Sequence, residues 1–450
     1  MNSLDIGALI DSRPLSAFQL RVLTLIGCLV LMDGFDVQVI GFVAPALLRS
    51  WQLQPNALGP IFGAGLFGML VGSTSLGMLA DRIGRRPVII GATFFVAVCV
   101  IATAVASSVP QLLVLRFMTG LGLGGVLGNA VTLASEYCPS ARRASLLMAI
   151  SCGFTAGAIF GGMLAAVLIP RFGWPSVFIV GGLLPLIVGI LSVHGLPESL
   201  QLLLVWRAPP ARLEYWLKRL APDALAPLTT DAQIHPDALR KASVLDLLQD
   251  GLGLRSVLLW AVSFANLLNL FFLANWLPLL ATRMGYSDSW GVLLGTTLQA
   301  GGIGGALLLG RLIDRFGFYR VLVPSFLLGT VMILAIGRPE LSIAIKCAVV
   351  LFAGATIVGG QPGINTLATS IYPTPLRATG VGWCLGIGRA GSIVGPVAAA
   401  QLIAHQVSNE ILFGIAAIPA LSASLVLIIM GSLSSPRVRS ASLRPRNSGA

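Results

Sequence analysis

Charged residues are scarce in this sequence. Only 10% of its 450 residues are Asp, Glu, Lys or Arg, whereas 56% are hydrophobic, and the mean hydropathy is +0.90. A soluble globular domain carries about 25% charged and about 45–50% apolar residues. A soluble surface this poor in charge would expose large apolar patches and aggregate. The composition therefore excludes a soluble fold and indicates a protein whose solvent is a lipid bilayer.

The signatures of metal, disulfide and nucleotide chemistry are also missing. The six cysteines stand singly, with no Cys-x-x-Cys pair and no histidine at ligand spacing. No Gly-Lys-Ser/Thr loop is present, which excludes ATP drive by this chain. Two Gly-x-Gly-x-x-Gly patterns, at 120–125 and 386–391, lie in apolar runs instead of after a strand, so we expect them to serve close helix packing. We expect no cofactor and no enzymatic activity.

Long apolar runs take the place of these motifs. A membrane-spanning helix needs about 20 mostly apolar residues. Such runs occur at 18–43, 57–79, 87–107, 111–135, 144–168 and 174–196, and again at 256–282, 290–312, 319–337, 342–370, 377–402 and 408–432. We therefore predict an all-α membrane protein with twelve transmembrane helices in two six-helix halves.

This pattern divides the chain into five segments. We predict a cytoplasmic N-terminus at 1–17, a first half at 18–196, a cytoplasmic linker at 197–255, a second half at 256–432 and a basic cytoplasmic tail at 433–450. The linker is rich in charge and is expected to contain short amphipathic helices. A plain tether and a regulatory segment are both open interpretations of it.

The basic residues are distributed unevenly between the two sides of the membrane. If both termini lie in the cytoplasm, most of the 29 Lys and Arg residues fall in cytoplasmic segments, and the opposite side holds only Arg49, Arg171, Arg283, Arg338 and Lys346. Because cytoplasmic loops carry an excess of Lys and Arg, we expect both termini to be cytoplasmic. The net charge of +12 does not indicate nucleic-acid binding, since these residues are not gathered on one face of a soluble fold.

An internal repeat supports the two halves. The segment Gly77-Met-Leu-Ala-Asp81-Arg82-Ile-Gly84-Arg85-Arg86 recurs, 233 residues later, as Gly310-Arg-Leu-Ile-Asp314-Arg315-Phe-Gly317. Each copy follows the second apolar run of its half. Parallel repeats with the substrate site between them are a known transporter plan. The halves are therefore expected to be pseudo-symmetric.

The repeated segments resemble the G-x-x-x-D-R-x-G-R-R signature of the major facilitator superfamily. Within it, the chain resembles the aromatic acid/proton symporter family nearly end to end, through Asp33-Gly-Phe-Asp36, Leu115-Arg116, Leu196-Pro197-Glu198-Ser199, Asn275-Trp276 and Gly388-Arg389. The resemblance implies the major facilitator fold and uptake of a hydroxybenzoate- or benzoate-like carboxylate with protons as the coupling ion. It also implies a bacterial inner-membrane protein, and we expect it to function as a monomer.

Two acidic residues lie inside the first apolar run. Asp33 is 12 residues past Arg21, about 18 Å into the membrane, and Asp36 lies one turn further on nearly the same helix face. Uncompensated charges at this depth cost on the order of 3 kcal/mol each. Burial and mutual repulsion favour the protonated form of at least one carboxyl, so we interpret the pair as the proton-coupling site. The alternatives are a backbone hydrogen bond near Gly34 or a permanent salt bridge to an arginine.

Two arginines also lie within apolar runs. Arg389 is 12 residues past Arg377, again about 18 Å deep, and its planar fork suits a carboxylate. We predict that it clamps the substrate's carboxylate; a fixed ion pair with Asp33 or Asp36 is the alternative.

Arg116 lies about a turn inside the fourth apolar run, and its Arg-x-x-x-Gly spacing resembles the superfamily's fourth-helix motif, which is associated with proton coupling. We assign it to that role. The alternative is an arginine that snorkels to the outer interface.

The repeated charges are interpreted as an inner gate. Helix-end charges can pair across the halves, whereas a simple positive-inside anchor would explain the arginines but not the aspartates and glycines. Glu136 is expected to pair with Arg142, Arg143 or a loop arginine. The predicted gate residues are Gly77, Asp81, Arg82, Gly84, Arg85, Arg86, Glu136, Asp314, Arg315 and Arg377.

Polar and aromatic residues in the runs are candidates for the rest of the substrate site. Amides could reach ring hydroxyls and aromatic side chains could contact the ring, although each is also a common helix-packing residue. With Arg389, the predicted substrate-binding residues are Asn129, Asn269, Trp276, Gln361, Asn365 and Trp383.

Two other functions compete with uptake. Efflux antiporters resemble the pattern G-x-x-x-G-P-x-x-G-G, and this chain has Gly153, Gly157, Gly161 and Gly162 at that spacing but Ala158 in place of the proline. The pattern therefore disfavours efflux without excluding it. A sensor of aromatic acids is the other alternative, but the 197–255 segment is short for a signalling domain.

Overall fold

The computed structural model describes residues 6–139, 142–206, 209–220, 244–249, 252–372 and 374–433, and every regular element in these ranges is a helix. The first part of the chain forms α1 (Ile6–Asp11), α2 (Ala17–Trp51), η1 (Pro55–Ala57), α3 (Leu58–Ile83), α4 (Arg85–Thr103), α5 (Val109–Tyr137), α6 (Arg143–Phe172) and α7 (Pro175–Gly195). The linker contains α8 (Leu200–Val205), α9 (Pro210–Leu220) and η4 (Val244–Leu248). The second part forms α10 (Gly253–Arg283), α11 (Asp288–Phe316), α12 (Phe318–Ile336), α13 (Ile343–Ala353), the π-helical turn η5 (Gly354–Val358), α14 (Gly359–Ile371), α15 (Thr374–Ala404) and α16 (Asn409–Leu433).

Twelve helical spans in the described ranges are long and apolar enough to cross a membrane. Each coincides with one of the twelve apolar runs, and α13, η5 and α14 together form the tenth. The predicted fold class is confirmed. The largest difference is the first span, which continues to Trp51 instead of ending near residue 43.

The two copies of the repeat end their helices in the same way. Gly84 separates α3 from α4 with φ +112°, and Gly317 separates α11 from α12 with φ +85°. With ψ near 150–160°, both residues occupy a region that is essentially restricted to glycine. The glycine of each Asp-Arg-x-Gly motif is therefore required by the backbone turn that follows the second span of each half.

Packing divides the chain into two compact units. Unit 1 comprises the described residues of Met1–Arg240 together with Ala274–Gln299 and Pro396–Gln406. Unit 2 comprises those of Lys241–Leu273, Ala300–Gly395 and Val407–Ala450. These units are defined by contacts, whereas the halves at 18–196 and 256–432 were predicted from the sequence. The two divisions differ because parts of α10, α11 and α15 pack in unit 1.

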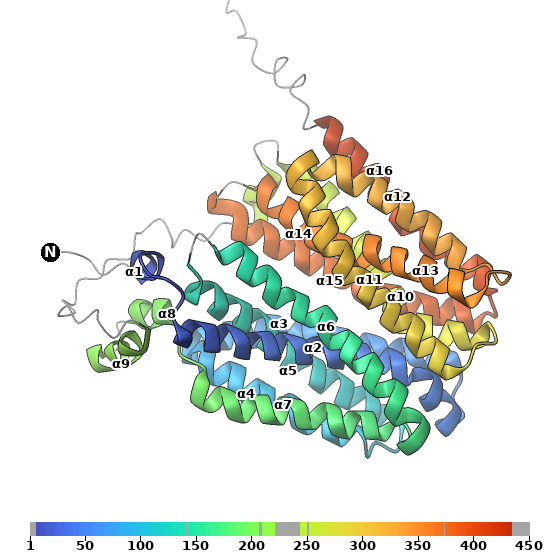
Figure 1. The fold of residues 1–450 in the computed structure, drawn as a ribbon, viewed down its shortest axis with the longest axis horizontal. Coiled ribbons are helices and arrows are strands. Elements are labelled where there is room, and N and C mark those ends of the chain that lie inside the picture. Colours follow the sequence, from blue (N-terminus) through green and yellow to red (C-terminus); the bar gives the residue numbers. More distant parts are fainter. Residues whose placement is uncertain are drawn as a thin grey trace, which may run out of the picture. The chain divides into compact units, whose positions relative to one another are not determined.

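Close helix pairs build unit 1. Helix α3 packs on α5 and α2 packs on α6 along much of their lengths (Figure 1). A Cβ at Gly120 would overlap the carbonyl oxygen of Gly65, and one at Gly34 would overlap that of Phe154. The helix-packing interpretation of the 120–125 glycines is therefore confirmed. Gly34, the centre of Asp33-Gly-Phe-Asp36, sets the distance between α2 and α6.

The described linker helices pack on unit 1. Leu200 and Leu203 of α8 and Leu213, Trp216 and Leu217 of α9 join the same buried cluster as the start of α2. In unit 2, α12 lies beside α16 (Figure 1).

Candidate functional site

The aspartates of α2 are enclosed by protein. The exposed fraction is 0% for Asp33 and 4% for Asp36. They lie on α2 next to Gly34, where the close contact with α6 brings helix backbones together. Any charge on these carboxylates must therefore be compensated mainly by neighbouring groups, since almost none of either side chain is exposed.

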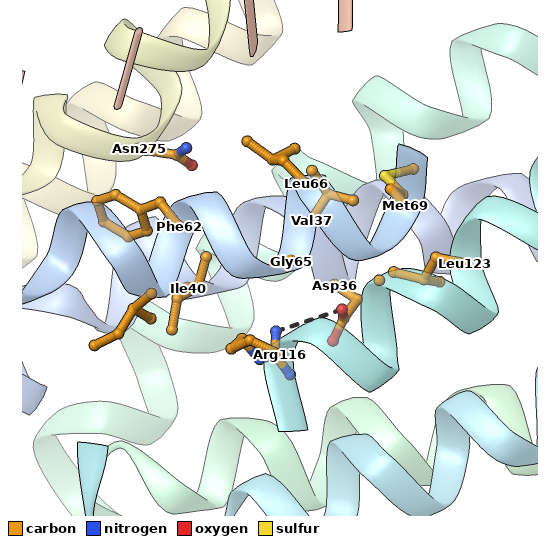
Figure 2. Close-up of a pocket in the computed structure, with 12 residues that line it drawn as sticks. Asp36, Val37, Ile40, Phe62, Gly65, Leu66, Met69, Arg116, Leu123 and Asn275 are labelled. Carbon is orange, nitrogen blue, oxygen red and sulfur yellow. Dashed lines mark hydrogen bonds and ion pairs between the residues drawn. The ribbon is translucent and has the colours of Figure 1, made fainter. Parts of the chain in front are cut away.

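Asp36 forms an ion pair with Arg116 of α5. The distance from Asp36 Oδ2 to Arg116 Nη1 is 3.4 Å, and Arg116 is 3% exposed (Figure 2). The other terminal nitrogen of Arg116 donates to Thr103 Oγ1 at 3.3 Å, and the guanidinium carbon lies 5.1 Å from the ring centre of Phe178. The alternative of a snorkelling Arg116 is therefore wrong, because the side chain turns into unit 1.

This pair is incompletely hydrogen-bonded. A separation of 3.4 Å is long for an N–H···O bond, and only one of the carboxylate oxygens is engaged. Asp36 Oδ1 and Arg116 Nε have no hydrogen-bond partner among the described residues. Because Oδ1 has free lone pairs, Asp36 can accept a proton without first breaking a tight bidentate contact.

Two small cavities flank Asp36. The first has a volume of about 30 Å³ and is lined by Asp36, Arg116, Phe62 and Asn275 among others (Figure 2). The second, of about 20 Å³, is lined by Asp36, Met32 and Thr93 among others. Each is large enough for one water molecule. Asp36 is thus placed between two spaces through which a proton could be relayed.

Arg389 belongs to unit 2, whereas Asp33 and Asp36 belong to unit 1. Its helix α15 packs closely on α10, because a Cβ at Gly388 would lie 2.5 Å from Ser263 Oγ and one at Gly391 would overlap the carbonyl oxygen of Phe264. The packing interpretation of this second glycine pattern is confirmed. The clamp on a substrate carboxylate, and the alternative pairing with an aspartate, both stay predictions.

The remaining substrate-site candidates fall into different environments. Asn129 donates to the carbonyl oxygen of Gly125 in its own helix at 2.8 Å, as a packing residue does. Trp276 is 0% exposed, donates to the carbonyl oxygen of Pro396 at 3.1 Å, and meets the ring of Phe62 edge-on. Both side chains are already engaged within unit 1. Their assignment to the substrate site gains no support from these contacts.

Four candidates belong to unit 2. Trp383 is 42% exposed and its ring lies 5.9 Å from that of Trp260. Asn269 is 0% exposed, and Gln361 Nε2 donates to Asn365 Oδ1 at 3.0 Å. The structure therefore brings together Gln361 and Asn365, and keeps Trp383 accessible.

A charged cluster joins the ends of four unit 1 helices. Glu136 of α5 pairs with Arg85 at the start of α4 and accepts from Ser199 Oγ at 2.6 Å. This confirms the expectation that Glu136 pairs with a loop arginine, and Arg85 is that residue. Arg86 donates to the carbonyl oxygens of Val193 and Leu196 at the end of α7.

Glu198 and Ser199 were not among the predicted site residues, and Glu198 is the more deeply engaged of the two. It is 2% exposed, and its Oε1 accepts from the backbone N–H groups of Arg85 at 2.9 Å, Arg86 at 3.3 Å and Ser199 at 3.0 Å. A carboxylate at a helix N-terminus compensates the exposed N–H groups and the helix dipole. The only sequence signal was a single acid directly after the sixth apolar run, within Leu196-Pro197-Glu198-Ser199.

The other gate candidates do not form such contacts in the described residues. Asp81, Arg82, Asp314 and Arg315 are exposed at the ends of α3 and α11. A Cβ at Gly77 would meet no atom within 4 Å. The Arg377 side chain lies outside the described part. Pairing of these charges across the halves stays a prediction.

Comparisons with known proteins identify the family of the chain. The family described as Major Facilitator Superfamily matches residues 26–396 and 293–449. The chain is 37% identical to a 4-hydroxybenzoate transporter, PcaK, of Pseudomonas putida, over 96% of this chain and 97% of the relative. It is 35% identical to a gallate transporter of Pseudomonas putida, over 95% of both chains. The xylose transporter XylE of E. coli shares the fold, with a TM-score of 0.71 at 17% identity over 91% of this chain and 96% of that one.

Proposed function

Because the chain belongs to the Major Facilitator Superfamily, we propose that it is a secondary transporter that takes up an aromatic carboxylate together with a proton by alternating access. The substrate class is supported by the relatives that are named transporters of 4-hydroxybenzoate and gallate. Membership of this family and twelve spans indicate a multi-pass membrane transporter instead of an enzyme.

The observation that carries proton coupling is the buried, incompletely bonded pair of Asp36 and Arg116. As an ion pair, the two side chains are electrically neutral together. When Asp36 takes a proton, the charge of Arg116 loses its compensation in a region where an isolated charge is costly. An anionic substrate that enters with the proton restores neutrality. Proton and carboxylate therefore favour each other's binding, which is the requirement for symport.

The fixed positive charge of Arg389 suits the substrate's carboxylate, since a guanidinium binds a carboxylate through two parallel hydrogen bonds. We propose that Arg389 supplies this clamp and that Asp33 and Asp36 share the proton-coupling task. The proton is the coupling ion, no other cofactor is required, and one chain is the working unit.

The proposed orientation follows the Lys and Arg distribution, with both termini and the Glu136–Arg85 cluster on the cytoplasmic side of a bacterial inner membrane. A load of one proton and one monoanion carries no net charge. Uptake of such a load responds to the pH gradient, and each additional proton would add about 2.3 kcal/mol per 100 mV of membrane potential.

The test is uptake of labelled 4-hydroxybenzoate into proteoliposomes with an imposed inward proton gradient. Accumulation that collapses when a protonophore is added supports symport. If the same inward proton gradient instead drove the export of preloaded substrate from the vesicles, the protein would be an efflux antiporter. An absence of any gradient-dependent movement of benzoate, 4-hydroxybenzoate or gallate would overturn the proposal.

Asp36→Asn separates coupling from binding. The variant keeps a polar side chain of the same size but cannot exchange a proton, so we expect gradient-driven accumulation to be lost while substrate exchange at equal concentrations continues. Unchanged accumulation in this variant would remove the proton role from Asp36.

A further inference from the structure

Unit 2 contains a row of four side-chain amides, two buried and two half-buried. Asn266 and Asn269 lie one turn apart on α10, near its middle, and Gln361 and Asn365 lie one turn apart on α14. We name these four residues the amide line. Asn266 and Asn269 are both 0% exposed.

The hydrogen bonds of the line fix its direction. Asn266 Nδ2 donates to the backbone carbonyl oxygen of Ile357 at 3.1 Å and to Gln361 Oε1 at 2.8 Å, and Gln361 Nε2 donates to Asn365 Oδ1 at 3.0 Å. A backbone carbonyl can only accept, so the nitrogen of Asn266 must face Ile357. Both of its N–H groups are then used, and Asn266 Oδ1 is held as an acceptor.

The contact with Ile357 depends on an irregular stretch of the tenth span. Ile357 lies in the π-helical turn η5, a geometry in which a backbone carbonyl accepts from the N–H five residues later in the chain. The bond that Asn266 donates to this carbonyl from α10 anchors the orientation of its amide.

The line ends in unsatisfied polar atoms. Asn266 Oδ1, Asn269 Oδ1 and Asn269 Nδ2 have no hydrogen-bond partner among the described residues. A buried amide without partners destabilises the folded protein. A group that supplies both a donor and an acceptor between Asn266 and Asn269 would relieve this cost.

We propose that the amide line reads a hydroxyl group on the aromatic ring of the substrate. The phenolic O–H donates to Asn266 Oδ1, and the phenolic oxygen accepts from Asn269 Nδ2. A carboxylate does not suit this position, because it has no hydrogen to offer the fixed acceptor. The inference rests on the proposed function and adds to it the two residues, Asn266 and Asn269, that distinguish a hydroxylated aromatic acid from an unsubstituted one.

An unsubstituted ring leaves the three atoms unpaired when it binds. Sites built to hydrogen-bond a hydroxyl reject the analogue that lacks it much more strongly than an apolar pocket rejects a smaller ligand. We expect 4-hydroxybenzoate or 3-hydroxybenzoate to compete for uptake at least about tenfold more strongly than benzoate.

The experiment measures inhibition of labelled 4-hydroxybenzoate uptake in proteoliposomes by unlabelled benzoate and by 3- and 4-hydroxybenzoate. Asn269→Leu keeps the size of the side chain but removes both polar atoms. In this variant the hydroxybenzoates should inhibit uptake about tenfold less strongly, while benzoate inhibits it as well as before. The ratio of inhibition by hydroxybenzoate to inhibition by benzoate should therefore fall towards one. Thr330→Val is the control, because Thr330 is a buried polar residue of α12 in unit 2 whose hydroxyl donates to the carbonyl oxygen of Phe326 in its own helix at 2.9 Å. The competition ratio of the hydroxybenzoates to benzoate in this variant should equal that of the wild type.

Two results would overturn the proposal. One is equal competition by benzoate and the hydroxybenzoates in the wild-type protein, which needs no variant to fold. The other is an unchanged ratio in Asn269→Leu, or in Asn269→Ser if the leucine variant is not recovered. Failure of the proposed function looks different, since no aromatic acid would then be taken up at all.

Discussion

Gly84 and Glu198 lie against each other so closely that no side chain fits between them. A Cβ at Gly84 would overlap Glu198 Oε2, and the backbone of Gly84 has φ +112°. The turn between α3 and α4 and the carboxylate that caps α4 therefore depend on the same glycine.

Gly84→Ala should destabilise the protein. A non-glycine residue in this backbone region costs on the order of 1–3 kcal/mol, and the new methyl group must also displace Glu198 from three backbone N–H groups. We expect a lower Tm in detergent and a lower yield of folded protein. Thermal unfolding followed by size-exclusion chromatography measures both.

The same repeat provides the controls. Gly77 and Gly310 have open space around them, whereas Gly317 has a positive φ with open space. Alanine should be tolerated at Gly77 and Gly310, and at Gly317 it should cost the backbone strain alone. Equal Tm values for all four variants would show that neither the conformation nor the contact with Glu198 matters.

Glu198→Gln tests the charge of the cap apart from its shape. Glutamine can still accept a hydrogen bond, but it does not compensate the helix dipole. We therefore expect the free energy of unfolding to fall by about 1 kcal/mol. Glu214→Gln is the control, since Glu214 lies on α9 in a half-exposed pair with Lys218 at 3.6 Å and such pairs contribute little. A Tm for Glu198→Gln as high as that of the control would contradict the capping role.

The twelve spans and the repeated segments that contain Gly84 and Gly317 could be recognised because they depend on local sequence, although Gly84 was assigned to a gate and not to a backbone turn. Apolar runs of about 20 residues and the repeated Asp-Arg-x-Gly are visible one segment at a time. The contacts of Arg116 could not be predicted in this way, since they depend on how α5 is rotated against α2. The same holds for Lys346, which was placed among the basic residues of the outer side but is 1% exposed within α13.

Arg116→Lys should impair coupling more than folding. Lysine keeps the positive charge, but its single ammonium group cannot reach both Asp36 and Thr103 as the guanidinium does. We expect the gradient-driven uptake rate to fall about tenfold with a nearly unchanged Tm. Thr103→Val, which removes only the second contact, should cause a smaller loss. A larger loss in Thr103→Val than in Arg116→Lys would contradict this order.

Arg389→Lys tests the carboxylate clamp in unit 2. Lysine should be tolerated structurally, because Gly388 and Gly391, which allow the close packing of α15 on α10, are unchanged in this variant. It retains the charge but cannot form two parallel hydrogen bonds to a carboxylate. We therefore expect the KM for 4-hydroxybenzoate to rise about tenfold, with a smaller change in maximal rate. Arg311→Lys, at an exposed position of α11, is the matched control. Both variants conserve charge. If the KM of Arg389→Lys stayed at the wild-type value, the clamp would be without support. If the KM rose equally in both variants, the cause would be a general effect of lysine on these helices.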